Sequence, residues 1–236
     1  MSALLAVEAV SRRFRGLLAV DGVSFDVAAG EIFAVIGPNG AGKTTLFNLI
    51  AGALAPSAGA IRLAGERIDG MRPDAIAARG VGRTFQIVRP FPAMTVRENI
   101  MVGSLMRTPH AREARVKAEA VMERMGFSAL ADRPAGALTL PDRKRLEVAR
   151  ALATEPRLLL LDEVMAGLRP TEVDGMVGVL REINRELVLV LFLRCKVVTP
   201  CAGARSLGAT GAAAGRGQRP ASPVRPRLHH RHMAGL

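Results

Sequence analysis

No segment of this chain is long and apolar enough to cross a membrane. The N-terminal apolar run from Leu4 to Val10 is short, contains Glu8 and has no basic residue before it, so it does not predict a signal peptide or an anchor. The longest later run, from Leu187 to Leu193, is far too short to span a bilayer. We therefore expect a cytosolic protein, unless a partner holds it elsewhere.

Cysteine is almost absent, and both copies, Cys195 and Cys201, lie near the C-terminus. A body without thiols fits a reducing compartment. Three of the four histidines also lie in this last segment, but the spacing from Cys201 to His229 matches no usual zinc-ligand pattern. We therefore predict no metal site there.

Acidic residues stop at Glu186, so the formal net charge of +12 is unevenly distributed. Eight of the 33 basic residues and none of the 21 acidic residues follow that position, which leaves residues 1–186 with a net charge of only +4. Residues 194–236 also have no Phe, Tyr or Trp on which a base could stack, so we predict no nucleic-acid partner.

The composition of the whole chain is that of a globular protein. The 236 residues are 49% hydrophobic and 23% charged, which is enough to bury a full core in one large domain. Strand and helix patterns alternate up to Glu186, as in an α/β fold. From about Thr199 the sequence becomes Ala, Gly, Arg and Pro without any period, which predicts a basic tail, residues 194–236, without regular structure.

A phosphate-binding loop stands between an expected strand, Ile32 to Ile36, and an expected helix that carries Leu46, Ile50 and Leu54 at helical spacing. Its string fits the G-x-x-x-x-G-K-[ST] pattern, in which backbone N–H groups and the helix N-terminus hold phosphate oxygens. Lys43 is expected to reach the β- and γ-phosphates of ATP, and the Thr44 hydroxyl to bind Mg²⁺. The predicted nucleotide-binding residues here are Gly37, Pro38, Asn39, Gly40, Ala41, Gly42, Lys43, Thr44 and Thr45.

Two acids end the apolar run that begins at Leu158. At the end of a buried parallel strand, Asp162 can hold Mg²⁺ and Glu163 can polarise the attacking water as a general base. Two such acids alone also fit the polar end of an ordinary strand. Together with the phosphate-binding loop, they indicate a catalytic carboxylate pair.

The middle of the chain reads as helical. Thr95 and Glu98 form a capping-box pattern, and one helix face follows at Ala114, Ala118, Val121, Met122 and Met125 before Gly126 ends it. A second helix is expected from Asp142 to Thr154, with Leu146, Ala149, Leu152 and Ala153 inward. A third begins at Pro170, with Val173, Met176, Val177, Leu180 and Ile183 on its apolar face.

Five motifs in order resemble the ATPase subunits of ABC importers, in their branched-chain amino acid branch. They are Gly37 to Thr45, R-T-F-Q-I-V-R-P-F around Gln86, M-T-V-R-E-N at Met94 to Asn99, R-L-E-V-A-R-A-L at Arg145 to Leu152, and L-L-L-L-D-E at Leu158 to Glu163. The resemblance implies a P-loop ATPase core in residues 1–193, with an inserted helical subdomain at about 88–150. It also implies ATP and Mg²⁺ as cofactors.

The resemblance assigns further roles. It implies a head-to-tail dimer with a second ATPase subunit, at the cytoplasmic face of the membrane, driving permease subunits through the region near residues 87–135. Gln86 resembles the residue that binds Mg²⁺ or the attacking water, although a lone Gln is also an ordinary loop residue. Phe14 resembles the ring that stacks on adenine, and a core Phe on the first strand is an equal alternative. Thr139 stands where the family's signature serine contacts the other subunit's ATP.

Two departures from the family pattern remain. The signature segment reads L-T-L-P-D, where Pro141 has no N–H to donate and Asp142 adds negative charge. The histidine expected after the next strand is absent, because none occurs between His110 and His229. The alternative to an active ATPase is therefore a nucleotide-binding subunit defective in hydrolysis. The acid-free tail also predicts a shifted reading frame after about Leu187, with a natural lipid-binding basic tail as the alternative.

Overall fold

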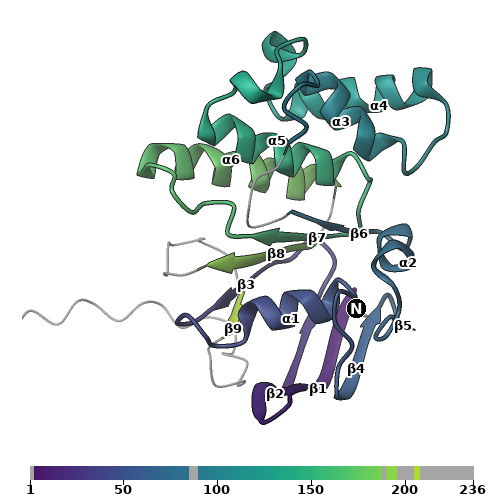
Figure 1. Ribbon diagram of the computed structural model, residues 1–236, viewed down its shortest axis with the longest axis vertical. Coiled ribbons are helices and arrows are strands. Elements are labelled where there is room, and N and C mark those ends of the chain that lie inside the picture. Colours follow the sequence, from purple (N-terminus) through teal and green to yellow (C-terminus); the bar gives the residue numbers. More distant parts are fainter. Residues whose placement is uncertain (1–2, 85–89, 188–189, 196–204, 208–236) are drawn as a thin grey trace, which may run out of the picture.

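The computed structural model describes residues 3–84, 90–187, 190–195 and 205–207, which form two β-sheets and the helices that cover them (Figure 1). One sheet is parallel and has the strand order β6-β7-β8-β3-β9. Its strands are β3 (Ile32–Ile36), β6 (Val81–Arg83), β7 (Leu158–Asp162), β8 (Val190–Cys195) and β9 (Arg205–Leu207).

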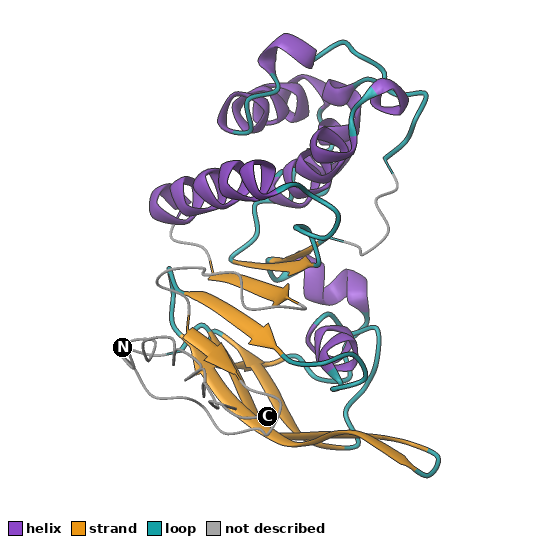
Figure 2. Cartoon of the chain, turned by 90° about the vertical axis from the view of Figure 1, so that its left-hand side faces the viewer, coloured by secondary structure: helices purple, strands orange, loops and turns teal. Residues whose placement is uncertain are grey.

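The other sheet is antiparallel, with the order β2-β1-β4-β5. Its strands are β1 (Leu5–Phe14), β2 (Leu17–Val27), β4 (Ala58–Leu63) and β5 (Glu66–Arg67). Figure 2 shows this sheet below the parallel one, with its longest hairpin projecting away from the helices. The sequence motifs did not predict this second sheet.

The helices divide into two groups. In Figure 1, four of them lie above the parallel sheet: α3 (Val96–Ser104), α4 (Ala111–Arg124), α5 (Leu140–Leu152) and α6 (Pro170–Leu187). Below it lies α1 (Lys43–Ile50), and α2 (Pro73–Ala78) stands at its edge. The upper group also contains the short 3₁₀ turns Ser128–Leu130 and Ala135–Ala137.

Alternate residues of the parallel strands enter two separate cores. On β7, Leu159 and Leu161 pack against the helices above, whereas Leu158 and Leu160 join α1 and the antiparallel sheet below. All four side chains are fully buried. A strand buried on both faces reads as a continuous apolar run, which explains the Leu158 to Leu161 sequence.

Most helix predictions are confirmed. Thr95 caps α3 through the expected capping box, in which its hydroxyl accepts from the Glu98 N–H and Glu98 accepts from the Thr95 N–H. The predicted inward faces of α4 and α5 are buried. Two boundaries differ: α5 begins at Leu140, where Thr139 caps it, and α1 ends at Ile50, so that Leu54 lies outside the helix.

The C-terminal predictions need correction where the structure describes this region. Leu187 ends α6 and does not open the next strand, which runs over Val190–Cys195, because a short apolar run cannot distinguish a helix end from a strand start. Regular structure also occurs within the predicted tail, since the backbone of Arg205–Leu207 pairs in parallel with β3. The rest of the tail lies outside the described residues. Within the part of the chain that the structure describes, no helix combines the length and apolarity that a membrane span requires.

Gly103 lets α3 approach α5 closely, and we expect its replacement by Ala to destabilise the protein. A Cβ atom at Gly103 would lie 2.3 Å from the Arg150 carbonyl oxygen, which belongs to the α5 backbone. Overpacking of this kind costs about 1–3 kcal/mol. The matched control is Gly178→Ala on α6, where nothing lies within 4 Å and the gain in helix propensity is up to about 1 kcal/mol. The urea midpoint of unfolding should therefore be lower for Gly103→Ala than for the parent, and equal or higher for Gly178→Ala. Equal midpoints for the two variants would contradict this packing.

Candidate nucleotide-binding site

The loop predicted to bind phosphate connects β3 to α1, as the sequence pattern requires. Gly40 and Gly42 both adopt left-handed backbone conformations, with φ of 82° and 76°. Gly42 is also the N-cap of α1, and its carbonyl accepts from the Leu46 N–H at 2.9 Å. The loop therefore ends directly on the N-terminus of a helix, where backbone N–H groups and the helix dipole favour an anion.

Gly42 is in contact with the antiparallel sheet. A Cβ atom there would lie 2.2 Å from the Ala19 carbonyl oxygen on β2. The β1–β2 hairpin is thus fixed next to the loop, and only glycine allows this approach. Phe14 pairs with Leu17, two residues before Ala19 along the same strand, so this hairpin carries Phe14 near the phosphate-binding loop.

Phe14 is not a core residue. Its side chain is 37% exposed, and the Arg12 guanidinium lies 4.8 Å from its ring centroid. This exposure excludes the alternative of a buried Phe on the first strand. An exposed ring on the hairpin that contacts the loop fits a surface on which a base can stack.

The Lys43 ammonium is held by the loop itself. Its Nζ atom donates to the carbonyl oxygens of Gly37 and Pro38, the latter at 2.6 Å, and the side chain is buried. These bonds keep the positive charge of Lys43 inside the loop, and the sequence pattern predicts that this loop binds the phosphates. The adjacent Thr44 side chain is exposed.

Asp162 ends β7 in a tightly organised position. Its backbone N–H donates to the Thr84 hydroxyl at 3.0 Å, and Thr84 is fully buried at the end of the neighbouring strand β6. Its carboxylate lies 3.6 Å from the Arg83 guanidinium, between Oδ2 and Nη2. Only 2% of the Asp162 side chain is exposed, so its carboxylate is shielded from bulk solvent.

Glu163 follows in an unusual backbone conformation, with φ of 50°. Its carbonyl oxygen accepts from the Lys144 ammonium at 3.2 Å and from the Ala166 N–H at 3.0 Å. A left-handed non-glycine residue is strained by about 1–3 kcal/mol and persists only where its surroundings hold it. Burial lowers the pKa of Lys144, while the Glu163 carboxylate opposes that shift.

Thr44 and Asp162 line the same cavity, which has a volume of about 1030 Å³. The cavity lies between the core and the upper helices, and α1, α2, β6, α3, α5 and β7 all contribute to its wall. A hydroxyl and a carboxylate are hard oxygen donors of the kind that Mg²⁺ takes together with nucleotide phosphates. The donor set present therefore fits a Mg–nucleotide complex. Gln86, the third predicted ligand, lies outside the described residues.

Comparison with known proteins decides the family. The family model described as ABC transporter matches residues 20–166. The chain is 41% identical over 198 residues to the high-affinity branched-chain amino acid transport ATP-binding protein BraF of Pseudomonas aeruginosa, covering 78% of each chain. It is 40% identical over 213 residues to the corresponding protein LivG of Escherichia coli, covering 83% of this chain and 84% of that one.

The chain belongs to the ABC transporter family. The ADP conformation of MJ1267, an ATP-binding cassette of an ABC transporter, has the same fold, with a TM-score of 0.79, 28% identity and 89% of each chain covered. The predicted α/β fold with a P-loop ATPase core is thereby confirmed. As a member of this family, the protein is an ATP-binding subunit whose hydrolysis of ATP is coupled to transport.

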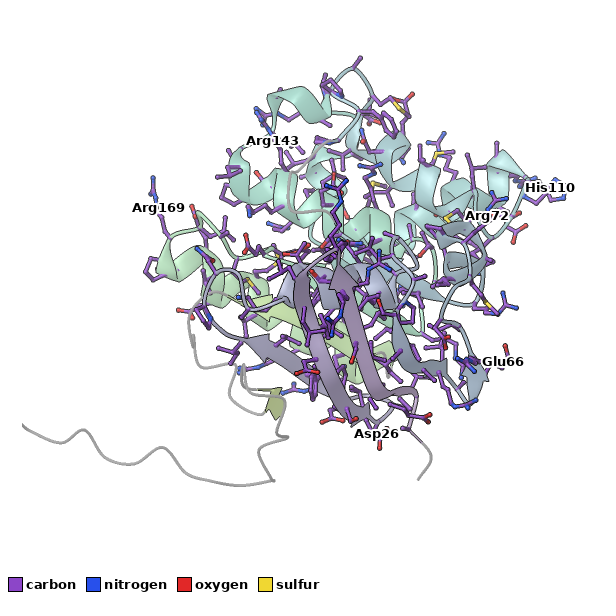
Figure 3. The ribbon with its side chains drawn as sticks, turned by 60° about the horizontal axis from the view of Figure 1, so that its bottom comes forward. Asp26, Glu66, Arg72, His110, Arg143 and Arg169 are labelled. Atoms are coloured by element: carbon purple, nitrogen blue, oxygen red, sulfur yellow. The ribbon has the colours of Figure 1, made fainter. Side chains whose placement is uncertain are left out.

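The variant signature segment of this ABC transporter subunit forms its own cap. The Thr139 hydroxyl donates to Asp142 Oδ2 at 2.7 Å and accepts from the Asp142 N–H at 3.4 Å. Pro141 removes one N–H from the same first turn of α5. Figure 3 shows Arg143, on this first turn, and Arg169 on the same side of the molecule, away from Arg72 and His110. Thr139 is therefore exposed, but its hydroxyl is already hydrogen-bonded to Asp142.

Three residues of the site were not singled out from the sequence. Arg83 and Thr84 belong to the R-T-F-Q motif, but only strand pairing brings them to Asp162. Lys144 reaches Glu163 from α5, nineteen positions away. A buried carboxylate at a strand end needs donors or cations nearby, yet nothing in the sequence identifies which ones.

Proposed function

We propose that this protein is the ATP-binding and ATP-hydrolysing subunit of an ABC importer for branched-chain or other hydrophobic amino acids. One observation carries the proposal: Thr44, on the helix that follows the loop, and the buried carboxylate at the end of β7 line one cavity. The names of its relatives BraF and LivG support the substrate class. We assign residues 1–193 to the ATP-binding domain, with residues 88–150 as its helical subdomain.

Each site residue then has a role. The loop from Gly37 to Thr45 and Lys43 hold the phosphates, while Thr44, Asp162 and Gln86 hold Mg²⁺, which neutralises charge on the transferred phosphoryl group. Glu163 accepts a proton from the attacking water. Phe14 offers its exposed ring to the adenine. Thr139 contacts the ATP of a second ATPase subunit, and Asp142 weakens that contact by placing a carboxylate beside phosphate.

The cavity also offers a surface for the permease, which would hold the protein at the cytoplasmic face of the membrane. Val102 and Met106, from α3 and the turn after it, line the cavity and are 37% and 51% exposed. Exposed apolar side chains around a recess are typical of protein interaction sites. The Arg150 guanidinium, which also lines the cavity, pairs with Glu147 at 3.0 Å and lies 4.9 Å from the Phe91 ring centroid. These two contacts hold the Arg150 side chain in place on the wall of the recess.

Reconstitution tests the proposal as a whole. With its cognate permease in proteoliposomes, the protein should drive uptake of labelled leucine with ATP and not with a non-hydrolysable analogue. In the same vesicles, Met106→Glu should reduce uptake and co-purification with the permease by about tenfold or more, because docking would desolvate a carboxylate.

The control variant for that experiment is Val116→Glu. Val116 is 62% exposed on α4 and does not line the cavity, so its variant should behave like the parent. ATP hydrolysis without uptake of any hydrophobic amino acid would refute the substrate class. Normal co-purification of Met106→Glu would refute the docking surface and leave the nucleotide site unaffected.

A further inference from the structure

Arg83 forms an ion pair with Asp162, the proposed magnesium ligand. Strands β6 and β7 are parallel neighbours, with Arg83 opposite Leu160, two residues before Asp162. This register brings the guanidinium to 3.6 Å from the Asp162 carboxylate, while the next residue, Thr84, accepts the Asp162 N–H. The Arg83 side chain is 16% exposed and that of Asp162 is 2% exposed. The pair is therefore shielded from water.

A buried carboxylate is unfavourable unless a cation or several donors compensate its charge. In a metal-free site that compensation comes from the protein, and after nucleotide binding it comes from Mg²⁺. A guanidinium stays protonated at any physiological pH, so its charge leaves the carboxylate only if the side chain moves.

Other cations around this site are bonded to other partners. Lys43 donates to the loop carbonyls of Gly37 and Pro38, and Lys144 donates to the Glu163 carbonyl. Arg150 pairs with Glu147 at 3.0 Å on the same cavity wall. Arg83, in contrast, forms its ion pair with the Asp162 carboxylate.

We infer that Arg83 is a resident counter-ion that keeps Asp162 in place before nucleotide binds and that opposes the entry of Mg²⁺. The inference rests on the proposed function, because it takes Asp162 as a magnesium ligand. Arg83 is thus a positioning residue with two effects: it stabilises the nucleotide-free protein and it weakens magnesium binding in the nucleotide complex.

The test is a magnesium titration of nucleotide binding, with a non-hydrolysable ATP analogue, on the full chain at pH 8. We expect Arg83→Met to lower the Mg²⁺ concentration at half-saturation by about tenfold, which corresponds to about 1.4 kcal/mol, while analogue binding in EDTA stays near the parental value. Thermal unfolding without nucleotide should move to lower temperature in this variant, and Mg²⁺ with the analogue should restore much of the loss.

Two further variants make the result decisive. Arg83→Lys keeps a charge and should titrate like the parent, whereas Arg83→Gln removes the charge and replaces Arg83→Met if the latter does not fold. Arg72→Met removes an arginine from an exposed pair with Asp74, and it should change neither the titration nor the unfolding. Direct Mn²⁺ binding, followed by electron paramagnetic resonance, gives the same affinities without any turnover.

Two outcomes would overturn the inference. An unchanged magnesium midpoint in Arg83→Met would reduce Arg83 to a packing residue. A higher midpoint would show that Arg83 helps Asp162 to bind the metal. If the parent protein itself bound the analogue without any effect of Mg²⁺, the proposed function would fail first, and the two failures are thereby distinguished.

Discussion

Glu163→Gln should abolish ATP hydrolysis and leave ATP binding intact. Glutamine has the same shape but cannot accept a proton, and a positioned general base contributes about 10²- to 10⁴-fold to the rate. The local backbone should survive the change, because Lys144 and Ala166 hold the Glu163 carbonyl and not its carboxylate. We therefore expect at least a hundredfold slower phosphate release, with calorimetry giving the parental affinity for ATP.

The matched control is Glu182→Gln on the exposed face of α6, which should hydrolyse ATP like the parent. Single-turnover conditions suit this comparison, since the chain lacks a histidine between His110 and His229 and we expect the parental rate to be low. Parental hydrolysis by Glu163→Gln would remove Glu163 from its role as the general base.

Lys43→Ala should remove most of the affinity for ATP. The ammonium is buried in the loop, and charge-assisted hydrogen bonds of this kind contribute about 1.5–3 kcal/mol each, or roughly tenfold to a hundredfold in affinity. We expect calorimetry to give a dissociation constant for ATP that is at least tenfold higher. The unfolding temperature should also fall, because the bonds to Gly37 and Pro38 are lost.

Lys117→Ala is the control for the lost charge. Lys117 lies on α4, where its ammonium pairs with Glu155 at 2.8 Å, remote in the fold from the loop. This variant should bind ATP like the parent. If Lys43→Ala and Lys117→Ala bound ATP equally well, the loop from Gly37 to Thr45 would not be the phosphate-binding site.

The sequence predicted those parts of the fold whose signals are local. The strand Ile32–Ile36, the loop and the β7 strand each combine an apolar run with a chemical motif, and the capping box of α3 depends on residues three apart. The antiparallel sheet was missed because β1 and β2 interrupt their alternation at irregular registers, so that no clean period of two appears.

Contacts between distant segments were equally invisible. Arg83 and Asp162 are separated by 79 positions, and their meeting depends on the order of strands in the sheet. Likewise β9 has only three residues, too few to show a period, and it exists through pairing with β3. The candidate site could thus be located by its motifs, while the groups that support it required the fold.

Helix α5 has a mechanical consequence. Its 13 residues form a rod about 20 Å long that begins directly after its N-cap, Thr139, carries Lys144 to the Glu163 carbonyl and places Arg150 on the cavity wall. Gly103 presses α3 against the same rod at the Arg150 carbonyl. Any tilt of α5 would therefore move three proposed features together: the contact with a second subunit, the backbone of the general base and the permease recess.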